Sequence, residues 1–161
     1  MSQKRMWMLA VSIPLAVAQI PIASGRAQAI RQLRPNLVHA QLGGRGILFT
    51  LNYERYFGPR IGAGVGVLAI GSSDGIVTLI PVFLSLNPVG NIHSLYLSPG
   101  AVFVAAGSPS EGDFDSTVFG AVEIGYQYQS ATGFVIRPAF DILFAEGGFL
   151  IWPAVSIGAS F

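Results

Sequence analysis

The sequence predicts an all-β protein, an eight-stranded antiparallel up-and-down transmembrane β-barrel that follows a cleavable signal peptide. Three observations support this fold class: the composition, a hydrophobic period of two, and the number of segments that share it. Hydrophobic residues make up 52% of the 161 residues and charged residues 11%, whereas a soluble domain carries about 25% charged residues. The 20 glycines and 10 prolines oppose long helices, because each Gly costs about 1 kcal/mol and each Pro about 3 kcal/mol inside one. This composition fits a chain whose outer surface need not face water.

The N-terminal residues have the three parts of a secretory signal peptide. Lys4 and Arg5 are positively charged, residues 6–23 are apolar, and Ala27-Gln28-Ala29 has the small-x-small pattern of a cleavage site. We expect residues 1–29 to be the signal peptide and residues 30–161 the barrel domain. An uncleaved membrane helix is the alternative, which the prolines and glycine of this segment disfavour. The absence of cysteine removes disulfides and thiolate zinc sites.

Alternating side chains predict strands in the rest of the chain. In the last segment, 148–161, the odd positions from Phe149 to Phe161 are all apolar, and the even positions are mostly small or polar. Residues 47–57, 60–70 and 133–144 repeat this pattern. Since successive side chains of a strand point to opposite faces, each of these strands has one bulky apolar face and one face of small or polar residues.

The face with small and polar residues is rich in glycine and serine, so it suits the lining of a narrow barrel better than a surface in water. The apolar face then meets lipid, and only a closed barrel can cross a membrane with strands. A soluble periplasmic β-barrel, with the bulky face inside, is the alternative. We expect eight strands, the even number typical of such barrels, at residues 36–42, 46–57, 60–70, 76–87, 92–105, 116–129, 132–144 and 148–161. The first segment is short, and if it merged with its neighbour only seven strands would remain.

Four charged residues fall on the face that we expect to line the lumen: Glu54, Glu123, Arg137 and Asp141. Glu123 and Arg137 lie at similar distances from the turn at Ser130-Ala131, which predicts that they pair across neighbouring strands. A buried charge is costly unless it is paired, and an eight-stranded barrel is only wide enough for its own side chains. We therefore interpret the four residues as a structural plug. A gate or an ion path is the functional alternative.

The sequence offers little that could support catalysis or ligand binding. Its two histidines, His39 and His93, have no assignable serine and acid partners, so we expect neither an enzyme nor a cofactor or metal site. Three spaced acids, Glu111, Asp113 and Asp115, fall in an expected outer loop at 106–115. They lack a full calcium-site pattern, and a solvated loop is the simplest interpretation. Lys4 is the only lysine, which argues against nucleic acid as a partner.

The C-terminal Phe161, with Ile157 and Ala159 at alternating positions before it, resembles the signal by which the barrel-assembly machinery recognises outer-membrane proteins. The runs Leu51-Asn52-Tyr53-Glu54-Arg55, Gly62–Gly66 and Ile80-Pro81-Val82 resemble the small outer-membrane β-barrel proteins common in Bacteroidetes-type bacteria. The resemblance implies a location and a fold rather than an activity.

We therefore expect a monomer in the outer membrane of a Gram-negative bacterium, with outer-membrane lipid and the assembly machinery as its partners. Its lumen would be largely filled by side chains, and its role would be structural or one of interaction and binding. A narrow porin-like channel for ions or small solutes is the alternative. A soluble periplasmic carrier is a lesser one.

Overall fold

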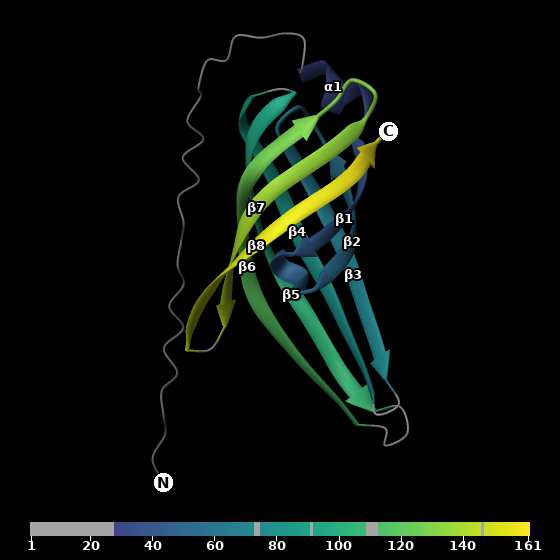
Figure 1. Ribbon diagram of the computed structural model, residues 1–161, viewed down its shortest axis with the longest axis vertical. Helices are drawn as coiled ribbons and strands as arrows, with labels where there is room; N and C mark the ends of the chain where they lie inside the picture. The colour runs from purple at the N-terminus through teal and green to yellow at the C-terminus, as the bar shows by residue number, and fades with distance from the viewer. Residues whose placement is uncertain (1–27, 73–74, 91, 109–112, 146) are drawn as a thin grey trace.

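Eight antiparallel strands close into one barrel, in which each strand pairs with its neighbours in the sequence and β8 returns to β1. The computed structural model describes residues 28–72, 75–90, 92–108, 113–145 and 147–161, so the expected signal peptide lies largely outside the described residues. The predicted fold and all eight predicted strands are confirmed (Figure 1). The strands are β1 (Asn36–Gly43), β2 (Phe49–Tyr56), β3 (Ile61–Ser72), β4 (Gly75–Gly90), β5 (His93–Ser108), β6 (Asp113–Gln129), β7 (Phe134–Ala145) and β8 (Gly148–Ser160).

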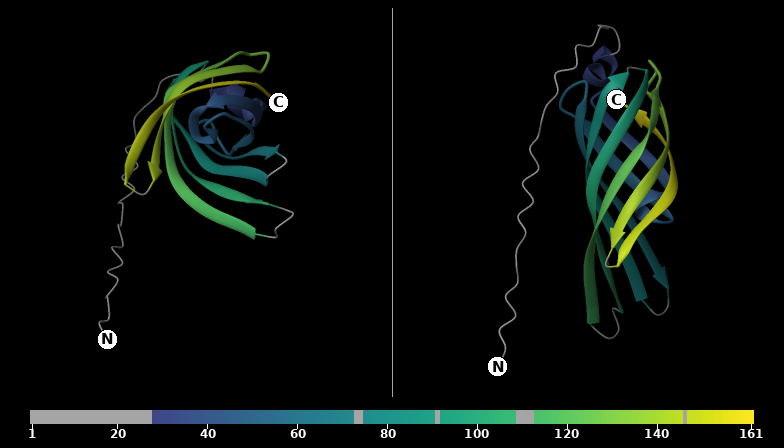
Figure 2. Two further views of the ribbon diagram at one scale, coloured as in Figure 1. Left: turned by 60° about the horizontal axis from the view of Figure 1, so that its bottom comes forward. Right: turned by 90° about the vertical axis from the view of Figure 1, so that its left-hand side faces the viewer.

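The two ends of the barrel differ. At one, which we call the helix end, the short helix α1 (Gln28–Leu33) lies beside the turns between strands and the C-terminus (Figure 1). At the other, the loop end, the hairpins β3–β4 and β5–β6 extend furthest (Figure 2, right). Among the described residues, no helix is long and apolar enough to cross a membrane.

The predicted alternation decides which side chains point into the barrel. In β2, Thr50, Asn52, Glu54 and Tyr56 are buried, whereas every intervening residue is exposed. The exposed residues of the barrel wall include many large apolar side chains, among them Leu51, Val65, Ile80, Val82, Leu84, Phe103, Ile124, Phe140, Phe144 and Ile157. The outer surface is thus apolar and the alternate side chains point into the barrel, as the sequence pattern predicts.

Two connections differ from the sequence expectation. The expected outer loop at 106–115 is largely strand, because β5 and β6 pair as far as Ser108 and Asp113. The turn between β6 and β7 takes four residues, 130–133, and the Ser130 N–H bonds to the carbonyl of Phe134. Gly133 permits this turn because its φ of 102° lies where residues with a side chain are strained.

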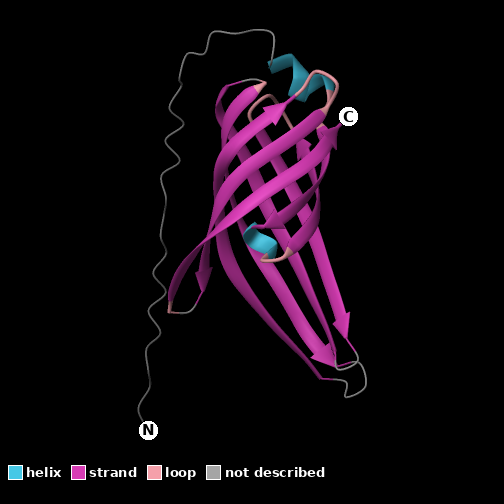
Figure 3. Ribbon diagram, viewed as in Figure 1, coloured by secondary structure: helices cyan, strands magenta, loops and turns pink. Residues whose placement is uncertain are grey.

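The hairpin β1–β2 is the shortest of the barrel and bends inward at its tip. Each of its strands has eight residues, and the tip forms a 3₁₀ turn, η1 (Gly44–Gly46), whose three residues are buried. Figure 3 draws η1 as a small cyan helix part-way along the barrel rather than at its rim. Gly43 enters this bend with a φ of 71°, and a Cβ there would lie 2.2 Å from the carbonyl oxygen of Pro153. Glycine therefore allows β1 to turn into the lumen.

Candidate functional site

The lumen holds an electrically balanced set of six buried charged side chains, which we call the luminal network. All four residues expected to line the lumen belong to it, and two arginines that the sequence analysis did not place there join them. Each of the six is no more than 3% exposed. Its members are Arg31, Arg45, Glu54, Glu123, Arg137 and Asp141.

Arg137 on β7 forms one centre of the luminal network. Its Nη1 donates to Oε2 of Glu54 at 2.7 Å, and its Nη2 donates to the hydroxyl of Tyr56 at 2.9 Å. The guanidinium also lies 5.1 Å from the ring centroid of Tyr96, within the range of a cation–π contact. His39 completes this group, with its Nε2 3.9 Å from Oε2 of Glu54. These contacts cross the lumen from β7 to β1 and β2.

Glu123 and Asp141 form the second centre. They lie directly opposite each other in the β6–β7 ladder, so two carboxyl groups share one region of the lumen. Arg45 of η1 supplies the compensating charge, with its Nη2 3.2 Å from Oε2 of Glu123 and its Nε 3.8 Å from Oδ1 of Asp141. Its Nη2 also donates to Oγ of Ser98 at 3.0 Å.

Further contacts hold this second centre in place. The guanidinium of Arg45 lies 4.3 Å from the ring centroid of Phe83. Glu123 accepts hydrogen bonds from the Gln41 amide and the Tyr96 hydroxyl. Tyr96 therefore touches both centres, since its ring contacts Arg137 and its hydroxyl contacts Glu123.

The predicted Glu123–Arg137 pair is wrong. The four-residue turn at 130–133 moves the β6–β7 register, so Glu123 faces Asp141, and each of the predicted partners has a different counter-charge. Arg137 pairs with Glu54, and Glu123 pairs with Arg45. The sequence did contain an indication that two more arginines belong in the lumen. Three acids and a single arginine on the inner faces leave two negative charges uncompensated, and buried charges are costly unless they are paired.

At the helix end, α1 inserts Arg31 into the lumen. Its Nη1 donates to the carbonyl of Pro59 at 3.2 Å, and its Nη2 donates to Oγ of Ser94 at 2.5 Å. The guanidinium lies 5.6 Å from the ring centroid of Tyr56. Burial of the guanidinium lowers the pKa of Arg31 below its ordinary value. The helix thus places a buried charged side chain at this end of the lumen.

Towards the loop end the inner surface becomes apolar. Five buried side chains pack together there, Leu68, Leu79, Val102, Ala121 and Leu143, with the partly buried Val104 and Phe119 against them. We call these seven residues the apolar floor. Two open cavities lie beside it, of about 360 Å³ between the tips of β3, β4 and β5 and about 320 Å³ between η1 and the tips of β6, β7 and β8. The sequence analysis did not identify this region.

The remaining predicted residues lie apart from the luminal network. Glu111 is outside the described residues, Asp113 is described only as the first residue of β6, and Asp115 is exposed on β6 opposite Ala106. Phe161 is exposed and exchanges two backbone hydrogen bonds with Asn36 beside the β1–β8 seam. Within the described part of the chain, no three His, Cys, Asp or Glu side chains are grouped so that they could hold a metal ion.

No family model and no curated protein matches the chain. Among solved structures, the N-terminal β-barrel domain of OprF from Pseudomonas aeruginosa superposes with a TM-score of 0.57 at 13% identity, covering 80% of this chain and 98% of that one. The outer-membrane protein Ail of Yersinia pestis in a phospholipid bilayer nanodisc gives 0.50 at 18% identity, covering 78% and 97%. The de novo designed TMB2.3 gives 0.50 at 11% identity, covering 80% and 94%. At these identities the likeness concerns the fold.

Proposed function

We propose that this chain is a small barrel protein of the outer membrane of a Gram-negative bacterium. Its lumen would be closed by its own side chains, and its role would be structural or one of binding at the loop end. The single observation that carries this proposal is the inverted barrel, with large apolar side chains outside and a balanced charged network inside. In a protein surrounded by water, that arrangement would expose apolar area on every strand and bury six charges.

The luminal network supports a closed lumen rather than a conducting one. Three arginines and three acids cross the interior from α1, η1, β2, β6 and β7, and the guanidinium groups of Arg31, Arg45 and Arg137 each stack on an aromatic ring. Eight strands leave space for little more than such side chains. A permanently open ion path would require several of these contacts to break.

Membrane fractionation combined with gel mobility before and after heating tests location and closure together. We expect the chain in the outer-membrane fraction, and we expect the unheated barrel to migrate differently from the boiled chain, because a closed barrel resists unfolding by detergent. Recovery in the soluble fraction without detergent would refute the membrane location. Steady single-channel conductance in a planar bilayer would favour the narrow channel over the closed barrel.

A further inference from the structure

We propose that the loop-end half of the barrel binds one acyl chain of a bilayer amphiphile, which enters over the short β1–β2 hairpin. The inference rests on the proposed membrane location and adds a ligand class to it. Three observations carry it: an apolar inner surface, a low side of the barrel wall, and a cavity that joins the two.

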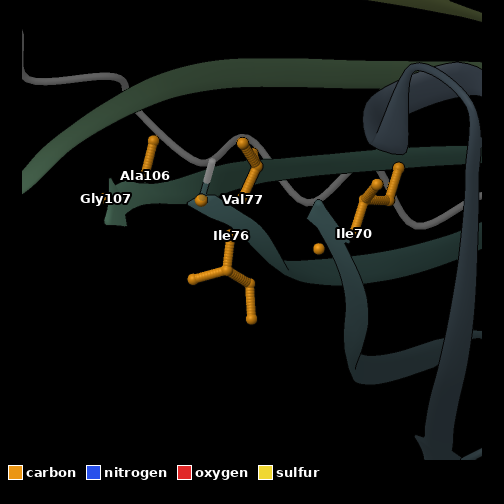
Figure 4. A pocket seen from close by; sticks show the side chains of 7 residues that line it. Ile70, Ile76, Val77, Ala106 and Gly107 are labelled. Atoms are coloured by element: carbon orange, nitrogen blue, oxygen red, sulfur yellow. The ribbon is translucent and has the colours of Figure 1, made fainter. Parts of the chain in front are cut away.

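On β3, β4 and β5 the inner surface continues the apolar floor up to the rim, whereas Thr117 and Asp115 take the inward positions of β6 opposite Val104 and Ala106. Ile70, Val77 and Ala106 follow Leu68, Leu79 and Val104 at the inward positions of β3, β4 and β5, and they line the larger cavity. Figure 4 shows these three side chains on one side of the strands, with Ile76 on the other. An aqueous vestibule would be lined by polar groups on all sides, so the β3–β5 side of this inner surface matches an apolar occupant.

The wall is low on one side only. The β1–β8 register reaches Gly43 opposite Ala154, while β8 continues back to Gly148. The β2–β3 register reaches Leu51 opposite Val67, while β3 continues to Ser72. In Figure 2, left, with the loop end turned toward the viewer, the blue β1–β2 hairpin lies within the curve of the longer strands.

The low side falls within the thickness of a membrane. Eight residues at about 3.3 Å each, tilted by about 45°, span about 19 Å of height, whereas the apolar band of such barrels is about 25 Å tall. The sixteen residues of β5 span about 37 Å by the same estimate. The gap above η1 therefore opens sideways into the hydrocarbon region, where an acyl chain is the available ligand.

The smaller cavity connects this gap to the apolar floor. Ile47 at the hairpin and Phe149 on the outer face of β8 line it, Leu150 lines it from the inward face of β8, and Phe119 and Leu143 belong to the floor. Ile47, Phe149 and Leu150 are all exposed, so the lining is continuous with the apolar outer surface. None of the side chains that line this cavity is polar, so an acyl chain can pass along them from the lipid to the inner surface.

Trp152 provides a reporter at the entrance. It is 37% exposed, and its Nε1 donates to the carbonyl of Ile47 at 3.1 Å across the gap. Trp7, the second tryptophan, is removed by Trp7→Phe in the full chain. The protein is reconstituted in nanodiscs of unbrominated phospholipid and titrated with dibrominated stearic acid, whose bromine atoms quench a nearby indole.

Two substitutions reduce the site, and one serves as a matched control. Ala145→Phe fills the smaller cavity, which Ala145 lines, and Ala106→Phe fills the larger one. Ala105→Phe adds the same ring to the exposed outer face of β5. Heat-dependent gel mobility confirms that each variant is a folded barrel before titration.

We expect saturable quenching in the parent chain and in Ala105→Phe. In at least one filled variant the apparent affinity should fall about tenfold, the loss expected when two buried methylene groups are displaced. Quenching that rises linearly and equally in all variants would show simple partitioning and overturn the acyl-chain site while leaving the membrane barrel intact. Recovery of the parent chain in the soluble fraction would instead overturn the membrane location on which the site rests.

Discussion

Replacement of Arg137 by methionine should destabilise the barrel by several kcal/mol, because it leaves a buried carboxylate without its close counter-charge. Glu54 is fully buried, and its shortest ion pair is the 2.7 Å contact with Arg137. Its other ionisable neighbour is His39, whose Nε2 is 3.9 Å away. Breaking a buried pair by removal of one partner costs about 3–5 kcal/mol. Methionine keeps much of the side-chain volume, so the loss reports charge more than a cavity.

The double variant Glu54→Gln/Arg137→Met separates the ion pair from general damage. Removal of both charges leaves no uncompensated ion at this centre, and buried pairs replaced by neutral groups are often close to neutral in stability. We expect the double variant to recover at least about 2 kcal/mol of the loss, a coupling energy within the range for residues in direct contact. Arg55→Met is the matched control, because Arg55 is exposed on the same strand as Glu54.

The assay is reversible urea unfolding in lipid vesicles, which gives the free energy of unfolding from the transition midpoint and slope. Arg55→Met should change that free energy by less than about 0.5 kcal/mol. If Arg137→Met stayed within the same margin, or if the double variant were no more stable than Arg137→Met, the luminal network would not hold the barrel together in the way described.

Three further outcomes follow from the same contacts. Gly66→Ala should cost about 1–3 kcal/mol of unfolding free energy, because a Cβ there would lie 2.0 Å from Oδ1 of Asn52. Gly71→Ala should be neutral, because the space around its Cβ is open. Equal urea midpoints for the two variants would contradict this prediction. Arg45→Ala should produce cation-selective openings in planar bilayers, because two facing carboxyl groups lose their shared counter-charge, and conductance identical to the parent protein would argue against it. Calorimetric titration with calcium should give no binding heat from the acids at 111, 113 and 115, and a saturable heat would reveal a cation site.

The strands could be predicted because each reports its orientation locally. In β2 the apolar and polar residues alternate from Phe49 to Glu54, so the inward position of Glu54 follows from the sequence. The same reasoning placed Glu123, Arg137 and Asp141 inside, where the structure has them. Which charges meet depends instead on turn length, and the sequence does not reveal that Gly133 extends the β6–β7 turn to four residues.

Two other features lacked a local signal for a physical reason. Alternation fails where both faces are apolar, as at Ile76 and Val77 in β4, so the inner surface of the loop end could not be distinguished from the outer one. The inward bend of η1 depends on space inside the closed barrel, which no segment encodes alone. From the sequence alone, Arg45 between two glycines is therefore predicted to lie in an exposed loop.

The length of the first hairpin governs both halves of the lumen. With eight-residue strands, η1 stops at the height of Glu123 and Asp141, where Arg45 reaches both. Two more residues in each strand would raise the tip by about 5 Å. This displacement would break the 3.2 Å contact between Arg45 and Glu123. The same extension would also raise the low side of the wall. The Arg45 contacts of the luminal network and the proposed sideways opening are thus two consequences of one short hairpin, and a change in its length would alter both together.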